Sequence, residues 1–276
     1  MVDNNAIAQH AATRFRSEYH YATFEYWRSA KLMRYLERAG VGPLGHVLDD
    51  GCGGGGMCVS LAEETDQVVG IDLCDRFTNA GTRLARELGV TNVVFAQANG
   101  SCLPFPDGTF DTVLSHAVIE HVADYGAYLR EARRMMRPNG RMFLQTSPYL
   151  SPHGSHLPRL KVPIPLHLVI GRRAAFVTSR WLAKHRPHWL DAPPDGSSFL
   201  TAARRGEVKD DDLLYRVTVR NLRQAIKDAG FRMMREDLYV SGLARRLFPE
   251  SVTAAVPKMP LARDILVTNM EYLLAV

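Results

Sequence analysis

Short apolar runs alternate with helical periodicity through the first half of the chain. Each run has the length of a buried strand, and the runs lie at residues 46–50, 68–72, 93–98, 110–115 and 141–146. Strands that alternate with helices predict a mostly parallel sheet with right-handed crossovers, the doubly wound α/β fold. In such a sheet ligands bind beyond the carboxyl ends of the strands, beside the first one.

Helical patterns fill the gaps between these strands. Apolar residues lie on one face of a predicted helix over residues 124–136, and other helices are expected to end at Leu61 and at Leu88. Near the start, a helix is predicted over residues 11–39, where apolar residues recur every three positions and Gly40 offers a C-terminal stop.

The aromatic stretch from Tyr19 to Trp27, "YHYATFEYW", lies within this first predicted helix. One interpretation is a buried helix face. The other is a lid that closes over a ligand, with Tyr19, Tyr21 and Trp27 lining the pocket of a second substrate. The sequence leaves both interpretations open.

The pattern changes after Ser147, where proline and histidine become frequent. We interpret this part as an insertion packed over the sheet. A helix with a glycine terminator is predicted at 218–230, followed by a sixth strand at 231–240 and a last strand at 268–276. The predicted organisation is therefore a helical cap (1–40), a binding core (41–147), an insertion (148–217) and a C-terminal completion of the sheet (218–276).

Composition adds few constraints. The apolar share of 46%, the charged share of 23% and the net charge of +5 are those of an ordinary soluble protein. Lysine and arginine form no long block, so no nucleic-acid partner is expected. The start has no signal-peptide pattern, no run reaches the roughly 18 apolar residues of a membrane span, and the four cysteines form no C-x-x-C pair. We expect reduced thiols and a cytoplasmic location, with the oligomeric state undetermined.

The sharpest motif is "VLDDGCGGGG", residues 47–56, which fits the glycine spacing of dinucleotide-binding loops. Glycines allow a ligand to approach the backbone, and free N–H groups there suit an anion. Asp49 argues against a pyrophosphate, because a carboxylate at the strand end would repel it. It favours a ligand with an ammonium group, such as S-adenosylmethionine.

Two further strand ends carry matching groups. Asp72 ends the second strand, where an acid accepts hydrogen bonds from both ribose hydroxyls. The stretch from Ala98 to Ser101 follows the third strand, where an adenine ring would lie, and Asn99 offers a side-chain acceptor for the adenine amino group. Together the three strand ends predict a methyl-donor site.

At this point the sequence resembles class I S-adenosylmethionine-dependent methyltransferases, in particular the ubiquinone and menaquinone group. The resemblance rests on "VLDDGCGGGG", "VVGIDLC", "LPFPDGTFDTVLSHAVIEHV" and "LREARRMMRPNGRMFL". It implies a seven-stranded sheet with the last strand antiparallel, and S-adenosylhomocysteine as the product. Asparagine at residue 99, where the family usually has aspartate, is a departure that implies altered donor affinity. The predicted donor-binding residues are Asp49, Gly51, Cys52, Gly53 and Gly55 at the methionine part, Asp72 and Leu73 at the ribose, Asn99, Gly100 and Ser101 at the adenine, and Ser115 and His116 near the methyl group.

The chemistry of the acceptor is less constrained. His116 is a candidate general base or contact, and His153 or His156 of the insertion is the other candidate. Oxygen is favoured over carbon as the methylated atom of a small molecule, in secondary-metabolite, quinone, or glycan and lipid biosynthesis. No metal spacing is present in the sequence, so no metal is expected.

Two other functions stay open. An NAD-dependent oxidoreductase would share the fold, although the sequence has no Tyr-x-x-x-Lys pair. A non-catalytic protein that binds S-adenosylmethionine is the other alternative. The basic stretch from Arg172 to Arg186 is either a solvated helix face or a surface for weak contact with a membrane or with a phosphorylated, lipid-linked acceptor.

Overall fold

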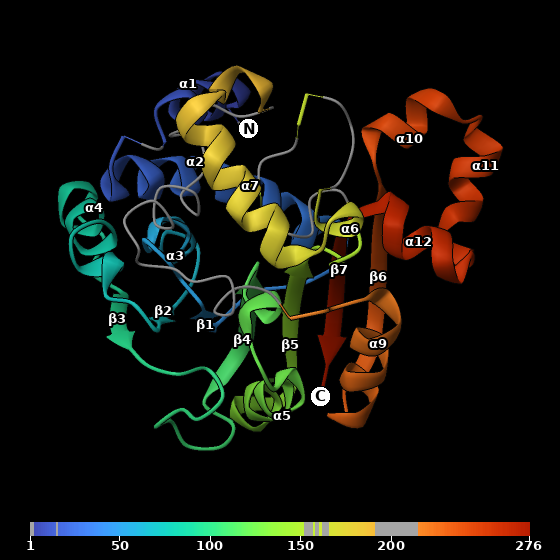
Figure 1. Cartoon of the computed structure of the whole chain (residues 1–276). Coiled ribbons are helices and arrows are strands. Elements are labelled where there is room, and N and C mark those ends of the chain that lie inside the picture. Colours follow the sequence, from blue (N-terminus) through green and yellow to red (C-terminus); the bar gives the residue numbers. More distant parts are fainter. Residues whose placement is uncertain (1–2, 15, 152–156, 158–159, 162–165, 191–214) are drawn as a thin grey trace.

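The computed structural model describes residues 3–14, 16–151, 157, 160–161, 166–190 and 215–276. Its centre is a seven-stranded sheet in the order β3-β2-β1-β4-β5-β7-β6 (Figure 1). The strands are β1 (His46–Asp50), β2 (Gln67–Asp72), β3 (Val93–Gln97), β4 (Phe110–His116), β5 (Met136–Thr146), β6 (Arg232–Val240) and β7 (Val267–Ala275).

The sheet has the predicted doubly wound topology. Strands β1 to β5 pair in parallel, whereas β7 runs antiparallel between β5 and β6. The chain order reverses between β1 and β4, so the crevice at their carboxyl ends is the expected ligand position. The prediction of a mostly parallel seven-stranded sheet with an antiparallel last strand is confirmed.

Helices cover both faces of the sheet. The face with α2 (Glu18–Arg38), α3 (Gly56–Ala62) and α4 (Gly81–Leu88) packs a core on Val47, Val68, Leu114 and Phe143. The opposite face, with α5 (Tyr125–Met135) and α9 (Val219–Asp228), packs on alternate strand residues such as Leu48 and Val113. This alternation decides which layer each polar residue at a strand end faces.

The N-terminal prediction needs a correction. Instead of one helix over residues 11–39 there are two, α1 (Asn4–Thr13) and α2, because Ser17 is extended and its side chain caps α2 by accepting from the His20 amide. The inner face of α2 also differs from the predicted spacing. Its buried residues are Ala22, Ser29, Leu32, Tyr35 and Leu36, whereas Trp27 is 36% exposed.

Strand β5 begins five residues before the predicted run at 141–146, so the turn sequence Pro138-Asn139-Gly140 lies inside the strand. Asn139 has a φ of +67°, and the register with β4 shifts between Phe110 and Thr112. The irregularity is a bulge at the amino end of the strand, away from the ligand edge.

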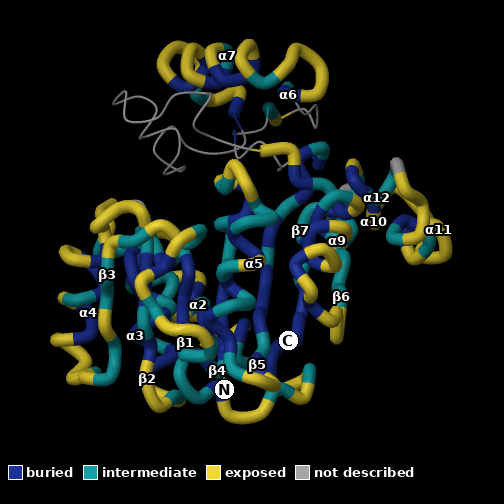
Figure 2. Tube along the Cα trace, turned by 90° about the horizontal axis from the view of Figure 1, so that it is seen from below, coloured by how far each residue is buried: buried dark blue, intermediate teal, exposed yellow. Residues whose placement is uncertain are grey.

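The remaining helices lie after β5 and between β6 and β7. Figure 2 shows α6 (Leu166–Val169) and α7 (Arg172–His185) beyond the carboxyl edge of the sheet. The sequence patterns did not predict α10 (Gly242–Leu247), α11 (Glu250–Ala255) and α12 (Pro260–Leu266), which connect β6 to β7. The four-part division of the chain stays a prediction.

Candidate functional site

The glycine loop between β1 and α3 is bent by three residues in the left-handed region. Gly51, Gly53 and Gly55 have φ values of +91°, +57° and +78°. A Cβ atom on Gly51 would also lie 2.2 Å from Cγ2 of Val118, so a side chain is excluded there for two reasons. The backbone of the loop is therefore kept open at the carboxyl edge of the sheet.

Gly56, the last glycine of the motif, serves a contact within the protein. A Cβ atom there would lie 1.9 Å from the carbonyl oxygen of Ala22 on α2. Ala22 is fully buried. Helix α2 thus packs backbone to backbone on the start of α3, and it covers one side of the glycine loop.

Asp49 and Asp50 face opposite layers of the sheet. Asp49 points toward α3 and accepts a hydrogen bond from Sγ of Cys58 at 3.0 Å, while its Oδ1 has no hydrogen-bond partner within the described residues. It is fully buried, and burial raises its pKa to about 6. Burial likewise raises the pKa of the Cys52 and Cys58 thiols. This fits packing roles for both.

Asp50 points toward α5 and is 3% exposed. Burial raises its pKa to about 7, against a hydrogen bond from the Tyr128 hydroxyl. A Cβ atom on Gly100 would lie 2.4 Å from its Oδ1, so the carboxyl group lies directly beneath the loop that follows β3. Sequence reasoning treated Asp50 as a neighbour of Asp49 and did not assign it this position.

Asp72, the last residue of β2, is hydrogen-bonded to the glycine loop. Its Oδ2 accepts a hydrogen bond from the amide of Gly53 at 2.9 Å, and its Oδ1 accepts one from the amide of Cys74 at 2.9 Å. Arg76 lies 3.9 Å from Oδ2. Leu73, the next residue along the chain, is 66% exposed at the same edge.

Asn99 forms a short turn after β3. Its side-chain oxygen accepts a hydrogen bond from the amide of Ser101 at 3.0 Å, and its backbone pairs with Cys102. The predicted adenine acceptor is therefore already bonded within its own turn. Within the described residues, the second lone pair of the amide oxygen and the two amide donors make no hydrogen bond and can meet a ligand.

Ser115 and His116 diverge at the end of β4. The Ser115 hydroxyl is fully buried and is hydrogen-bonded to the Tyr128 hydroxyl at 2.7 Å, in the layer of α5. His116 faces the layer of α2, where burial and the charge of Arg28 lower its pKa to about 3. The imidazole is therefore neutral near pH 7. Ala117, the next residue, has a φ of +58°, a left-handed conformation that costs energy for a residue with a Cβ atom.

A hollow of about 180 Å³ opens beside His116. Apolar side chains of α2, α3 and β5 line its body, and Arg28, Lys31 and Glu271 lie at its boundary. Glu271 accepts hydrogen bonds from Tyr239 and Asn269, and burial raises its pKa. The apolar lining residues are Leu32, Tyr35, Met57 and Phe143.

The three aromatic candidates of α2 take different directions. The Tyr19 hydroxyl donates a hydrogen bond to Glu87 of α4. The guanidinium of Arg83 lies over the Tyr19 ring, 4.1 Å from its centroid. Trp27 stacks on His10 of α1 at 5.9 Å. Neither contact supports a position in the pocket beside His116. Tyr21 differs, since it lies one turn before Glu25 on α2, and burial and the charge of Glu25 raise its pKa.

Glu25 and Arg28 are residues of this side of α2 that sequence reasoning missed. Oε1 of Glu25 lies 3.7 Å from Arg28, and Oε2 is buried without a hydrogen-bond partner in the described part of the chain. Burial raises the pKa of Glu25 to about 7; Arg28 and Arg76 lower it, and Asp49 and Asp72 raise it. Periodicity could have indicated them, because residues 21, 25 and 28 share a face with Ala22.

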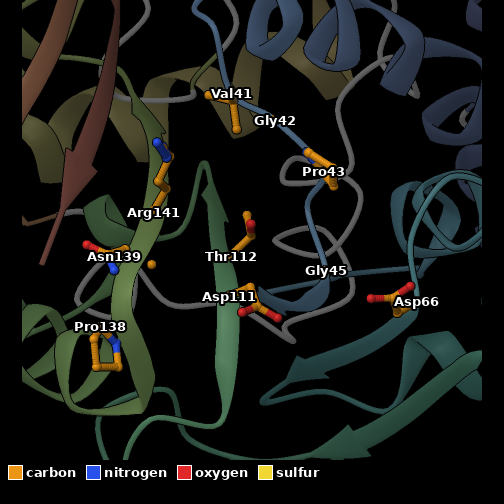
Figure 3. Close-up of a pocket in the computed structure, with 11 residues that line it drawn as sticks. Val41, Gly42, Pro43, Gly45, Asp66, Asp111, Thr112, Pro138, Asn139 and Arg141 are labelled. Carbon is orange, nitrogen blue, oxygen red and sulfur yellow. The ribbon is translucent and has the colours of Figure 1, made fainter.

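Other candidates do not join this site. His153 and His156 lie outside the described residues. A second hollow of about 440 Å³ lies at the amino ends of β1, β4 and β5, opposite the glycine loop, with Asp111 and Arg141 at its edge (Figure 3). Among the described residues no group of three His, Cys, Asp or Glu is placed to hold a metal ion. No helix described is long and apolar enough to cross a membrane.

Known proteins resemble the chain in sequence over the segment that holds the glycine loop. The family described as "Methyltransferase domain" matches residues 48–144. The chain is 39% identical over 100 residues to the ubiquinone biosynthesis O-methyltransferase of Azorhizobium caulinodans, covering 36% of this chain and 39% of that protein. It is 35% identical over 115 residues to the ubiquinone/menaquinone biosynthesis C-methyltransferase UbiE of Pasteurella multocida, covering 39% of this chain and 43% of that protein.

The structural similarity extends over more of the chain. A geranyl diphosphate methyltransferase solved in complex with SAM superposes with a TM-score of 0.56 at 18% identity, covering 99% of this chain and 91% of that one. At this identity the similarity shows the fold alone. The aligned part of the chain spans about half or less of the curated relatives' length.

Proposed function

Because residues 48–144 form a methyltransferase domain of the class I S-adenosylmethionine-dependent type, we propose that the protein transfers a methyl group from S-adenosylmethionine to a small-molecule acceptor. S-adenosylmethionine is the cofactor of this class of domain. The acceptor nucleophile forms a bond to the methyl carbon while the S–CH₃ bond breaks, and S-adenosylhomocysteine leaves. The observation that supports this proposal most is the buried Asp49, whose Oδ1 lacks a partner beside an open glycine loop.

The residues at the three strand ends fit the parts of this cofactor. The methionine part would lie along Gly51, Cys52, Gly53 and Gly55, near Asp49. The ribose would lie at Asp72 and Leu73, where the carboxylate keeps unused lone pairs besides its two backbone hydrogen bonds. The adenine would lie at Asn99, Gly100 and Ser101. Ser115 is directed into the core, so we assign the methyl region to His116 alone.

A pyrophosphate would fit this place poorly. Glu25, Asp49 and Asp72 bring three carboxyl groups to the loop; burial is the main cause of the raised pKa of Glu25 and Asp49, and the neighbouring carboxylates add to it. A doubly charged anion would add to their repulsion, whereas a cationic sulfonium and an ammonium would reduce it. This electrostatic balance favours S-adenosylmethionine over NAD.

We place the acceptor in the hollow beside His116. Its apolar lining by residues such as Leu32 and Phe143 suits a ring, and both curated relatives named above are enzymes of quinone biosynthesis. A hydroxylated aromatic ring is therefore the acceptor that we propose, with oxygen favoured over carbon. A neutral imidazole accepts a hydrogen bond from the hydroxyl and orients its oxygen toward the methyl group. With a pKa of about 3, His116 orients and polarises this hydroxyl, and the hydroxyl proton leaves to solvent water as the O–CH₃ bond forms.

The exposed side of α7 supports a further part of the proposal, a weak contact with a membrane surface. Val177 and Trp181 on this side are 64% and 54% exposed, although the helix already buries Phe176 and Leu182 on its other side. No acidic residue occurs in the sequence between Glu131 and Asp191. A helix with exposed apolar side chains among cations suits an anionic lipid surface, from which an apolar acceptor could be taken.

The test of the proposed function is binding followed by transfer. Calorimetry should show that the purified protein binds S-adenosylhomocysteine and not NADH. Labelled donor, offered with a panel of hydroxylated aromatic compounds, should then transfer its methyl group to one of them. A protein that binds only NADH would contradict the proposal. Binding of S-adenosylhomocysteine together with transfer to the acceptor panel would distinguish an enzyme from a non-catalytic binding protein.

A further inference from the structure

Helix α2 brings charged side chains to the glycine loop from outside the matched domain. Its backbone contacts the start of α3 at Ala22, which fixes the distance between helix and loop. Tyr21, Glu25 and Arg28 then follow at i, i+4 and i+7 on one side of the helix. These residues lie outside the 48–144 region, so the family match assigns them no role.

Among the described residues Glu25 has one close cation, Arg28, and the ion pair between them is long. Arg28 is 3.7 Å from Oε1, beyond hydrogen-bond distance, and Oε2 is buried with no partner in the described part of the chain. The other charged and titratable groups that face it are Tyr21 of α2, Asp49 of β1, Asp72 of β2 and Arg76 of η1 (Arg76–Thr78). A buried carboxylate in this position is unfavourable unless a cation is supplied.

We propose that Glu25 binds the α-ammonium group in the methionine part of the methyl donor. The inference rests on the proposed function, since it assigns a residue of α2 to the same cofactor. Asp49 belongs to β1, which leads into the loop, and Glu25 belongs to α2, which packs on it, so the ammonium would be held between two carboxylates. The loop amides are left for the α-carboxylate of the donor, and Arg28 lies close enough to share that charge.

Release of a proton from Glu25 when the ammonium binds is a second measurable consequence of this assignment. Glu25 titrates near pH 7 without ligand, so part of the population is protonated at that pH. An ammonium beside the carboxyl group favours its charged form, and binding therefore releases a proton. A ligand without the amino group would leave the proton in place.

The test compares two ligands and two variants by calorimetry. S-adenosylhomocysteine has the ammonium, whereas 5′-deoxy-5′-methylthioadenosine keeps the adenosine and the thioether sulfur without the amino-acid part. Glu25→Gln should weaken binding of S-adenosylhomocysteine at least about tenfold and leave methylthioadenosine within about twofold. Glu37→Gln, an exposed acid on the same helix, is the matched control and should change neither affinity.

Each outcome decides the proposal. Equal affinity of wild type and Glu25→Gln for S-adenosylhomocysteine overturns it, and so does an equal loss for both ligands, which would indicate a role in packing. If wild type binds neither ligand, the proposed function fails with it. Should Glu25→Gln not fold, Glu25→Asp provides the test, since its shorter side chain should weaken binding of S-adenosylhomocysteine and leave methylthioadenosine unchanged. Wild type at pH 7 in buffers of different ionisation enthalpy gives the second readout. Proton release with S-adenosylhomocysteine and none with methylthioadenosine is expected, and equal release for both contradicts the proposal.

Discussion

The carboxyl group of Asp50 fills the space that a side chain at Gly100 would need. A Cβ atom on Gly100 would lie 2.4 Å from Oδ1 and 2.6 Å from Oδ2 of this buried aspartate. The first strand of the sheet thus sets the shape of the loop after the third strand, and the two residues have to be considered as a pair.

The pair predicts a specific pattern of double mutants. Gly100→Ala should lower the free energy of unfolding by about 1–3 kcal/mol, because the new methyl group displaces the carboxyl group or the loop. It should also weaken S-adenosylhomocysteine binding. In the Asp50→Ala background, Gly100→Ala should lower the free energy of unfolding much less, since the space of the carboxyl group is then free. Thermal denaturation of both singles and the double measures this coupling.

Gly42→Ala is the control for that experiment, because nothing lies within 4 Å of its added Cβ atom. Its unfolding free energy should match wild type. If Gly100→Ala lowers the free energy of unfolding equally in wild type and in Asp50→Ala, the proposed pairing is contradicted.

The raised pKa of Asp50 predicts how stability depends on pH. Its pKa rises from 3.8 to about 7 on burial, so the folded state binds more protons than the unfolded state between about pH 4 and pH 7. Stability contributed by this group is therefore lost as the pH rises through that window, up to about 4 kcal/mol. Asp50→Asn removes the charge and should raise the melting temperature at pH 8 by several degrees, at about 2–4 °C per kcal/mol.

At pH 4 the melting temperatures of Asp50→Asn and wild type should differ little, because the carboxyl group is then protonated. Burial also raises the pKa of Asp49, Glu25 and Glu120, so the variant should reduce the pH slope without abolishing it. A variant that is less stable than wild type at pH 8 would show that the charge itself is needed.

Replacement of Asp72 should weaken donor binding for two reasons. Asp72→Ala removes the acceptor of the ribose hydroxyls, and it also releases the amides of Gly53 and Cys74 that shape the loop. An affinity loss of about 2–4 kcal/mol for S-adenosylhomocysteine is expected from two or more lost hydrogen bonds to a charged acceptor. Asp72→Asn, which keeps one acceptor oxygen, should lose less. Unchanged affinity in Asp72→Ala would remove this residue from the donor site.

His116 should affect turnover more than donor affinity. His116→Gln removes the imidazole that would orient the acceptor, so we expect kcat to fall by about 10²-fold or more while the Kd of S-adenosylhomocysteine stays within about twofold. Because its pKa is lowered to about 3, His116 should add no inflection to the pH–rate profile between pH 5 and pH 8. An inflection in this range that disappears in His116→Gln would show a base that is poised near neutrality.

The prediction of the sheet from the sequence was accurate because strand residues carry a local signal. The predicted starts and ends of β1, β2 and β4 agree with the structure within one residue, since buried parallel strands read as apolar runs between turns. The bounds of β6 agree equally well, although β6 is an edge strand that pairs antiparallel with β7. The three helices between β6 and β7 gave no such signal, because each is short and none covers a full face of the sheet.

The candidate site could be predicted only where it follows a strand. Asp49, Asp72 and Asn99 follow from topology, since carboxyl ends of parallel strands share one edge. Glu25 and Arg28 could not be found in this way, because their position depends on the packing of α2 over the loop. Ser115 was expected near the methyl group, yet the strand alternation turns it into the layer of Tyr128.

The exposed side of α7 predicts lipid-dependent association. The protein should cosediment with vesicles that contain anionic lipid and much less with neutral ones, and added salt should weaken the association. Trp181→Ala with Val177→Ser should reduce the bound fraction severalfold by removing apolar contact. Phe248→Ala, an exposed aromatic that follows α10, is the matched control and should bind as wild type. Equal binding of all variants would exclude α7 as the contact.

The close contact between Ala22 and Gly56 has a consequence for how this sequence can evolve. A helix whose backbone rests on a glycine leaves no room there for even one methyl group, so position 56 is restricted to glycine whatever side chain stands at position 22. Descendants of this sequence are expected to keep glycine at position 56 for as long as they keep this N-terminal helix. Where a lineage loses the helix, the glycine is released and other small residues become acceptable there.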